Sequence, residues 1–173
     1  AVINTGRVIR KEEDWKRYRL VRVADGFRRR LDSFYAGKPE SSVSFADGFP
    51  FLLTSRESLA YLNTQLPDPI YMNRFRPNIV VAGGDLPFFE DSLQTIRIGD
   101  VVFGLVKPCA RCPITMTEQE TGKRGKEPLR TLTRIRWQQN AKGEMGAMFG
   151  QNLVHRNVGT IRIGDRVEVL NFK

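Results

Sequence analysis

Apolar and polar residues alternate along several short stretches of the chain, with the period of two that half-buried β-strands show. Strands are predicted in this way at Tyr18–Val23, Ser44–Leu53, Thr95–Phe103 and Thr160–Leu170, and the apolar run at Pro77–Ala82, closed by Gly83-Gly84, predicts a buried strand. Turn signals punctuate them: Asp47-Gly48 interrupts the second stretch and Gly99-Asp100 the third. The words Thr-Ile-Arg-Ile-Gly-Asp occur at 95–100 and again at 160–165, which we interpret as two uses of one hairpin type.

Helical periodicity appears in two places. The first helix is predicted to follow a Thr54-x-x-Glu57 capping box and to end before Pro67. Three leucines at i, i+3 and i+7 form its apolar face: Leu59, Leu62 and Leu66. The second helix is predicted with Pro128 at its first helical position, and its apolar residues are Leu129, Leu132 and Ile135. Many short strands with two short helices predict a mainly β (α+β) domain such as a small barrel.

The length and composition favour one independently folding domain. With 173 residues, a chain buries roughly two-thirds of its unfolded surface, so folding requires neither disulfides nor a structural metal. No apolar run approaches the roughly 18 residues of a membrane span, and the Arg-rich start lacks the apolar core of a secretory signal. We therefore expect a soluble protein of the reducing cytoplasm. Because the first residue is Ala1, we also expect a processed chain or a piece of a longer one.

Positive charge changes this picture by implying an anionic partner. The net charge is +9 and the isoelectric point about 10.0, with basic residues dense in 7–22 and 28–30. Nucleic acid is the usual partner of such a chain. However, acidic residues are mixed with the basic ones, and no helix-turn-helix, zinc-finger or RNA-binding motif accompanies them. A solvated basic face or an anionic cofactor pocket is the preferred interpretation.

The only two cysteines, Cys109 and Cys112, lie three residues apart at the end of an apolar run. A thiolate is the nucleophile and the metal ligand, and we expect the guanidinium of Arg111 to favour ionised Cys112. A structural zinc site lacks ligands, since His155 is the only histidine. A thioredoxin-type site is disfavoured by Pro113 and the β-branched residues after it. A buried, purely structural pair of cysteines stays open.

Three polar clusters lie beside predicted strand ends. They are Arg74–Asn78, Cys109–Cys112 and Phe149–Asn152. An arginine presents a planar fork of donors suited to phosphate, an asparagine both donates and accepts, and Gly150 lets the backbone approach closely. Together the clusters could supply donors to one anion, although each taken alone is more typical of an ordinary surface loop.

Taken together, these sequence segments resemble the MOSC domain, named after the C-terminal domain of molybdenum cofactor sulfurase. They are most similar to the C-terminal half of the mitochondrial amidoxime-reducing component and its bacterial relatives that reduce N-hydroxylated compounds. The resemblance runs in order from about residue 18 to the end and includes Phe45–Leu53, Phe75–Val80, Ile98–Phe103, Val106–Cys112, Glu118–Gly122, Glu127–Leu129 and Phe149–Leu153. It implies a MOSC-type β-barrel of short, mostly antiparallel strands with a few short helices.

The resemblance also implies domain boundaries and two departures. Residues 41–173 would be the MOSC domain, and residues 1–40 a basic remnant of, or link to, an N-terminal β-rich region that relatives carry. That region supplies basic residues to the cofactor phosphate in relatives, and this chain begins where it is ending. Relatives usually have Ser inside the cysteine motif where this chain has Ala110, so one hydroxyl contact is missing.

A molybdenum pyranopterin cofactor follows from the same resemblance. Cys112 would be the metal ligand and the catalytic residue, with Cys109 a non-ligating neighbour. Four residues would hold the polar head and phosphate of the cofactor: Arg76, Asn78, Arg111 and Asn152. Soft thiolate ligation suits such a metal.

The resemblance implies an oxidoreductase that reduces the N–O bond of N-hydroxylated bases or amidoximes. No cysteine follows Cys112 to hold an iron–sulfur cluster, so electrons would come from a separate ferredoxin- or flavoprotein-type donor. The alternative is a non-catalytic module that carries the cofactor, or carries sulfur as a persulfide on one of the cysteines. Nucleic acid is not expected as a partner.

Overall fold

The computed structural model describes residues 22, 24–27, 29–36, 42–43 and 46–173. The predicted strand at Tyr18–Val23 lies outside these residues except for Arg22, so it stays a prediction. In the described part of the chain, no helix is both long and apolar enough to cross a membrane.

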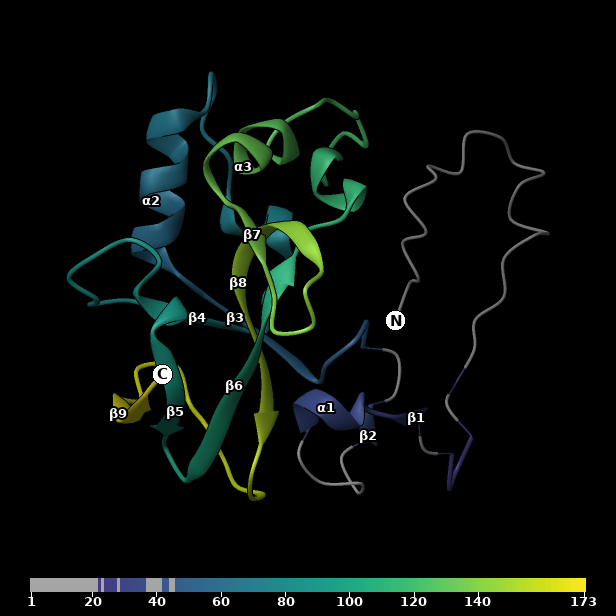
Figure 1. The fold of residues 1–173 in the computed structure, drawn as a ribbon, viewed down its shortest axis with the longest axis vertical. Coiled ribbons are helices and arrows are strands. Elements are labelled where there is room, and N and C mark those ends of the chain that lie inside the picture. The colour runs from purple at the N-terminus through teal and green to yellow at the C-terminus, as the bar shows by residue number, and fades with distance from the viewer. Residues whose placement is uncertain (1–21, 23, 28, 37–41, 44–45) are drawn as a thin grey trace.

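One curled sheet organises the molecule (Figure 1). Its strands are β3 (Phe51–Ser55), β4 (Ile79–Val81), β5 (Leu93–Ile98), β6 (Val101–Ala110), β7 (Trp137–Gln139), β8 (Met145–His155) and β9 (Val167–Phe172). They follow the order β4-β3-β8-β6-β5-β9, with β7 paired to β8. Every pair is antiparallel except β3 with β4. The mainly β prediction is confirmed, as a half-barrel that stays open between β4 and β9 in the described residues.

A small N-terminal layer lies beside this sheet (Figure 1). The strands β1 (Arg29–Arg30) and β2 (Ser42–Val43) pair with each other, and the short helix α1 (Ser33–Ala36) lies between them in sequence. Leu31 and Val43 pack with Val154 of β8 in a small apolar cluster. Burial of these three side chains fixes the layer to the sheet by the hydrophobic effect.

Two further helices and three 3₁₀ turns complete the fold of the described residues. They are α2 (Arg56–Gln65), α3 (Leu129–Ile135), η2 (Met72–Phe75), η3 (Phe89–Asp91) and η4 (Pro113–Met116). The cap of α2 differs from the prediction by one residue: the Ser58 N–H donates to Ser55 Oγ at 3.1 Å. Glu57 instead accepts the Gly83 N–H at 2.8 Å, so it ties the helix to the end of β4 rather than closing a capping box. Pro128 is the N-cap of α3 rather than its first residue.

The apolar residues divide into two main cores. The first lies within the sheet and is formed by Leu53, Ile79, Val81, Leu93, Ile96, Ile98, Val101, Phe103, Leu105 and Leu153. The second joins β8 to the helices and is formed by Leu62, Leu66, Phe75, Leu132, Ala147 and Phe149. The predicted apolar faces of both helices are confirmed, because Leu62 and Leu132 are completely buried there.

The two copies of Thr-Ile-Arg-Ile-Gly-Asp, at 95–100 and 160–165, do not form two hairpins. The first copy is β5 with its turn into β6, as predicted. In the second, residues 160–163 form no strand, and the chain becomes extended only at β9, which pairs with β5. The two copies lie together, since the Asp100 N–H donates to Thr160 O at 3.3 Å. A strand needs a neighbour for its backbone groups, and the free edge of β5 is taken by β9.

Candidate functional site

The cysteine motif lies where β6 ends (Figure 1). The pairing of β6 with β8 continues to Ala110 opposite Met148, and the Arg111 N–H then donates to Ala147 O at 2.9 Å. Pro113 has no N–H and a fixed φ, so it starts the η4 turn instead of extending the strand. Cys112 is thereby held in extended backbone between a strand and a turn.

Stacking of two buried rings brings the other two polar clusters to this place. Phe75, at the end of η2, and Phe149, in β8, have centroids 4.0 Å apart and planes within 21° of parallel. Both side chains are fully buried. The Arg74–Asn78 and Phe149–Asn152 segments therefore meet through their aromatic residues, a contact that no local sequence pattern predicts.

Arg111 connects the cysteine motif to η2, and the cysteine to which it donates a hydrogen bond is Cys109, not Cys112. Its Nη1 lies 2.9 Å from Cys109 Sγ, and its Nη2 donates to Phe75 O at 2.7 Å. The hydrogen bond of Arg111 is therefore to Cys109, and its expected effect on the Cys112 thiol stays a prediction. The reason for this hydrogen bond lies in the strand: β6 carries Cys109, and the Phe75 carbonyl draws the guanidinium to that side. The buried Nε of Arg111 has no hydrogen-bond partner among the described residues.

The two thiols consequently have different surroundings. Both are free, and Cys112 is exposed whereas Cys109 is half-buried. Among the described residues Cys112 Sγ has no hydrogen-bond partner. His155 does not join the motif, since it lies opposite Phe103, six positions before Cys109 and so about 20 Å away along β6. Across the described part of the chain, no three His, Cys, Asp or Glu side chains come together as a metal centre.

Arg76 and Asn78 follow η2 directly. Arg76 caps this turn with φ of 55° and ψ of 46°, a left-handed conformation that is uncommon for a residue with a side chain. Its exposed side chain makes no hydrogen bond or ion pair with any described residue. Asn78 is more constrained, because its Oδ1 accepts the Leu52 N–H at 2.8 Å while its own N–H donates to Leu52 O at 3.0 Å. The Asn78 amide nitrogen still carries two unused donors.

Asn152 lies on β8, the strand that pairs with β3, where Leu52 contacts Asn78. In β8 it is opposite Leu52 of β3 on one side and Lys107 of β6 on the other. Asn152 is therefore a near neighbour of Asn78 through Leu52, and its side chain has no partner among the described residues. Gly150, two positions earlier, has φ of +81° and passes so close to β3 that an added Cβ would lie 2.6 Å from Leu53 O.

A polar seam between η2 and the loop after η4 forms the rim of the site. The Asn73 amide donates to Glu120 Oε1 at 3.1 Å, and Gln119 Nε2 donates to Asn73 O at 2.8 Å. Arg74 Nη1 approaches Thr115 O at 3.5 Å. These contacts hold the Arg76 segment to the segment that follows Cys112. The sequence offered no signal for them beyond polar residues in predicted loops.

A buried carboxyl group lies where β3, α2 and η3 meet. Glu90 is completely buried and accepts from the hydroxyls of Ser55 and Ser58 at 2.9 and 2.8 Å. Burial raises the pKa of Glu90, and the two hydroxyls only partly oppose this. Because Ser55 caps α2 and Ser58 also accepts the Phe88 N–H at 2.7 Å, the carboxyl joins β3, α2 and η3.

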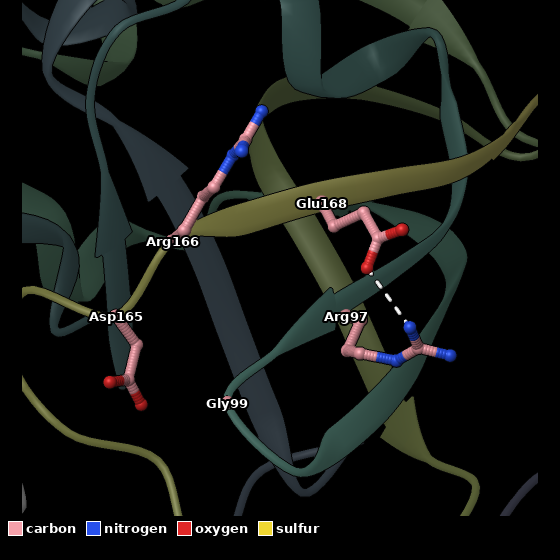
Figure 2. Close-up of a pocket in the computed structure, with 5 residues that line it drawn as sticks. All are labelled: Arg97, Gly99, Asp165, Arg166 and Glu168. Atoms are coloured by element: carbon pink, nitrogen blue, oxygen red, sulfur yellow. Dashed lines mark hydrogen bonds and ion pairs between the residues drawn. The ribbon is translucent and has the colours of Figure 1, made fainter.

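A separate cavity lies at the opposite end of β6 (Figure 2). It has a volume of about 490 Å³ and is lined by Arg97, Gly99, Asp165, Arg166 and Glu168. Arg97 is paired with Glu168 at 3.0 Å, and Figure 2 shows the Asp165 and Arg166 side chains directed away from this pair. The ten residues of β6 place this cavity about 30 Å from the cysteines. None of the predicted site residues lines it.

Comparison with known proteins agrees with these features. The MOSC domain family matches residues 40–168. Human mitochondrial amidoxime-reducing component 1 is 38% identical over 159 residues, which cover 88% of this chain and 47% of that protein. Molybdenum cofactor sulfurase of Arabidopsis thaliana is 34% identical over 142 residues, which cover 74% of this chain and 17% of that protein. The chain thus spans less than half the length of these relatives.

A solved structure supports the fold independently of close sequence similarity. YiiM from Geobacillus stearothermophilus superposes with a TM-score of 0.50 at 14% identity, covering 71% of this chain and 55% of that one. The mainly β architecture and the family match over most of the chain lead to one conclusion. The chain belongs to the MOSC domain family.

Proposed function

We propose that this chain binds a molybdenum pyranopterin through Cys112 and forms the cofactor-binding part of a reductase of N-hydroxylated bases or amidoximes. The observation that carries the proposal is the exposed Cys112 thiol, which has no partner among the described residues although polar groups surround the end of β6. The relatives named amidoxime-reducing component favour this substrate class.

The residues present fit such a cofactor. One thiolate cannot hold a metal alone, so a metal here would have to bring its other ligands with it, as a metal in an organic cofactor does. Arg76 and Asn152 each have donors without partners, and the buried Arg111 Nε is an unsatisfied donor at the same place. Asn78 would contribute its amide nitrogen. These four residues would hold the polar head and phosphate, and Cys112 would bind the metal.

When bound, the cofactor would supply two-electron redox chemistry at the exposed end of β6. Reduction of an N-hydroxyl group consumes two electrons and two protons, breaks the N–O bond, and gives the amine and water. The chain's own residues would anchor and orient the cofactor. The electrons would come from a separate donor protein of the ferredoxin or flavoprotein type. A reducing compartment such as the cytoplasm suits the proposal because both cysteines are free thiols.

Metal content tests the proposal directly. The chain and its Cys112→Ser variant would be expressed in cells that make the cofactor, with molybdenum measured by elemental mass spectrometry and pterin by fluorescence. We expect near-stoichiometric molybdenum in the parent chain and loss of at least nine-tenths of it in the variant. Cys109→Ser is the matched control and should keep its molybdenum. Loaded protein would then be supplied with dithionite and an N-hydroxylated purine.

The opposite results have a defined meaning. Equal molybdenum content in Cys112→Ser and the parent chain would show that Cys112 is not the metal ligand. A chain without molybdenum whose Cys112 or Cys109 carries one labile extra sulfur atom would instead support the alternative, a persulfide carrier. The similarity to molybdenum cofactor sulfurase is the observation that keeps this alternative in view.

A further inference from the structure

An irregularity in β6 changes the face of the sheet on which Lys107 lies. From Leu105 to Lys107, β6 advances by two residues while its partner β8 advances by one, so Val106 is an additional residue in β6. Such a bulge interrupts the alternation of side chains between the two faces of a sheet. Leu105 packs in the core within the sheet, whereas Val106 packs against the apolar cluster of the N-terminal layer. Lys107 follows Val106 to that side, where its ammonium lies 5.0 Å from the centre of the Tyr35 ring.

The bulge makes Lys107 a cross-strand neighbour of Asn152, although sequence analysis did not include Lys107 among the site residues. Residues directly opposite in an antiparallel pair have side chains on the same face and Cβ atoms about 4.5–5.5 Å apart. Asn152 is opposite Lys107 on one side and opposite Leu52 on the other, and Leu52 in turn contacts Asn78. An ammonium beside two amides provides donors for an oxyanion.

Lys107 has a carboxylate partner that it can exchange. Its Nζ lies 3.2 Å from Glu144 Oε2, and the Glu144 side chain is 62% exposed. Water therefore screens this ion pair, and such pairs contribute little to stability. The Asn140 amide donates to the same Glu144 oxygen at 2.7 Å, so Glu144 would keep a donor without Lys107. An anion beside Lys107 and Asn152 would compete with Glu144 at small cost.

Comparison with Lys142 shows what is particular to Lys107. Both ammonium groups lie over the Tyr35 ring, and each is paired with a carboxylate, so neither lysine is an excess charge. Lys142, however, belongs to the turn between β7 and β8 and is held by Asp32. Its position opposite Asn152 is therefore what distinguishes Lys107. The buried Tyr35 hydroxyl has no hydrogen-bond partner among the described residues, and a buried polar group of this kind usually has one.

We propose that Lys107 is a phosphate-binding residue of this site, and that Glu144 is an internal competitor which Lys107 leaves when a phosphate group binds beside Asn152. The inference rests on the function proposed above and deepens it, because the phosphate group expected here is that of the cofactor. A free phosphate ester has the same chemistry, so the experiment has to distinguish the two sources. No covalent bond changes in this exchange, since the ammonium only passes from one oxyanion to another.

Binding of inorganic phosphate to the chain without cofactor tests Lys107 directly. Phosphate is titrated calorimetrically, with chloride at equal ionic strength as the control for screening. We expect Lys107→Met to raise the dissociation constant at least about tenfold, as loss of one charge-assisted hydrogen bond does, and Lys142→Met, the matched control, to change it less than about twofold. Glu144→Gln should lower the dissociation constant, because the competitor loses its charge. Lys107→Gln replaces Lys107→Met if that variant does not fold.

The two halves of the ion pair separate this role from a structural one. If Lys107 only fastened the turn between β7 and β8 through Glu144, Lys107→Met and Glu144→Gln would both weaken phosphate binding. Opposite effects of the two variants support the exchange. Effects in the same direction, an equal loss in Lys142→Met, or no binding of phosphate by the parent chain would overturn it.

Protein loaded with molybdenum and pterin identifies the source of the phosphate group. If the cofactor supplies it, the loaded parent chain should no longer bind inorganic phosphate, and loaded Lys107→Met should lose pterin fluorescence faster than the parent chain during dialysis. Equal phosphate affinity of the loaded and unloaded chains would overturn the assignment to the cofactor and favour a free phosphate ester. A chain that takes up no molybdenum contradicts the reductase, whereas the phosphate titrations decide the role of Lys107 alone.

Discussion

Arg111 donates to the sulfur of Cys109, with Nη1 and Sγ 2.9 Å apart, while its Nη2 donates to Phe75 O at 2.7 Å. The guanidinium also lies 5.5 Å from the centre of the Phe75 ring. One side chain therefore holds the end of β6 to η2, the turn that leads into Arg76 and Asn78. Cys109 is half of this connection, and Cys112 is left free of it.

Removal of the Cys109 sulfur should weaken this connection. In Cys109→Ala the Nη1 group loses its acceptor in a partly buried place, and we expect the free energy of unfolding to fall by about 1–2 kcal/mol. Cys109→Ser keeps an acceptor and should lose less. Urea unfolding of the two variants and the parent chain measures this. Equal stability of Cys109→Ala and the parent would mean that the Arg111–Cys109 contact contributes nothing to folding.

The two thiols should also differ in accessibility. Cys112 is exposed and Cys109 is half-buried against Arg111, so iodoacetamide should label Cys112 several-fold faster in the native chain without cofactor. Peptide mass spectrometry at timed intervals follows each site. Urea-unfolded chain is the control, in which the two rates should converge. Equal or faster labelling of Cys109 in the native state would show that its burial against Arg111 does not limit access to the sulfur.

Local patterns in the sequence predicted the elements well, and long-range contacts account for the misses. The apolar face of α2 follows from the spacing of leucines within ten residues, so the sequence alone predicts it. The cap was misplaced by one position because Thr54 and Ser55 are both capping residues, and only the buried Glu90, 35 positions after Ser55, selects Ser55. The second hairpin failed because strand pairing with β5 joins segments about 70 residues apart.

The site shows the same limit. The three polar clusters can be identified in the sequence. Their proximity in space depends on Phe75 stacking on Phe149, 74 positions later in the chain. Arg111 has a cysteine on either side in sequence. The guanidinium bonds to Cys109 while it also donates to the Phe75 carbonyl, 36 positions away, and no local sequence pattern identifies that carbonyl as its partner.

Gly150 should not tolerate a side chain. Its φ of +81° costs an alanine about 1–2 kcal/mol. The new Cβ would also lie 2.6 Å from Leu53 O and 2.8 Å from Thr54 Cγ2, so β3 and β8 would have to separate beside Asn152. We expect Gly150→Ala to lower the free energy of unfolding by about 3 kcal/mol or more, in the range of severe core substitutions.

Gly143→Ala is the matched control for this prediction. It has a similar φ of +82° but meets only Gln139 Nε2, at 3.4 Å, so it should cost only the backbone strain of about 1–2 kcal/mol. Thermal or urea unfolding compares the two variants. A Gly150→Ala variant no less stable than Gly143→Ala would show that the close approach of β3 to β8 is unimportant.

The buried Glu90 carboxyl should make stability depend on pH. Burial raises its pKa in the folded state, Asp91 acts in the same direction, and the Ser58 and Ser55 hydroxyls oppose both. The folded protein thus keeps a proton on Glu90 at pH values where the unfolded chain has released it. Unfolding releases that proton, so the free energy of unfolding should fall as pH rises from the ordinary pKa of glutamate to the raised pKa of Glu90. Within that window the fall approaches about 1.4 kcal/mol per pH unit.

Glu90→Gln isolates this contribution, because an amide can still hydrogen-bond to the two serine hydroxyls and does not titrate in this range. Its unfolding free energy should decline less steeply with pH than that of the parent chain, so the variant gains relative stability toward the upper end of the window. Asp68→Asn removes one exposed carboxyl and should leave the slope unchanged. Urea unfolding at closely spaced pH values measures all three slopes. Parallel slopes for Glu90→Gln and the parent chain would mean that Glu90 holds no additional proton in the folded state.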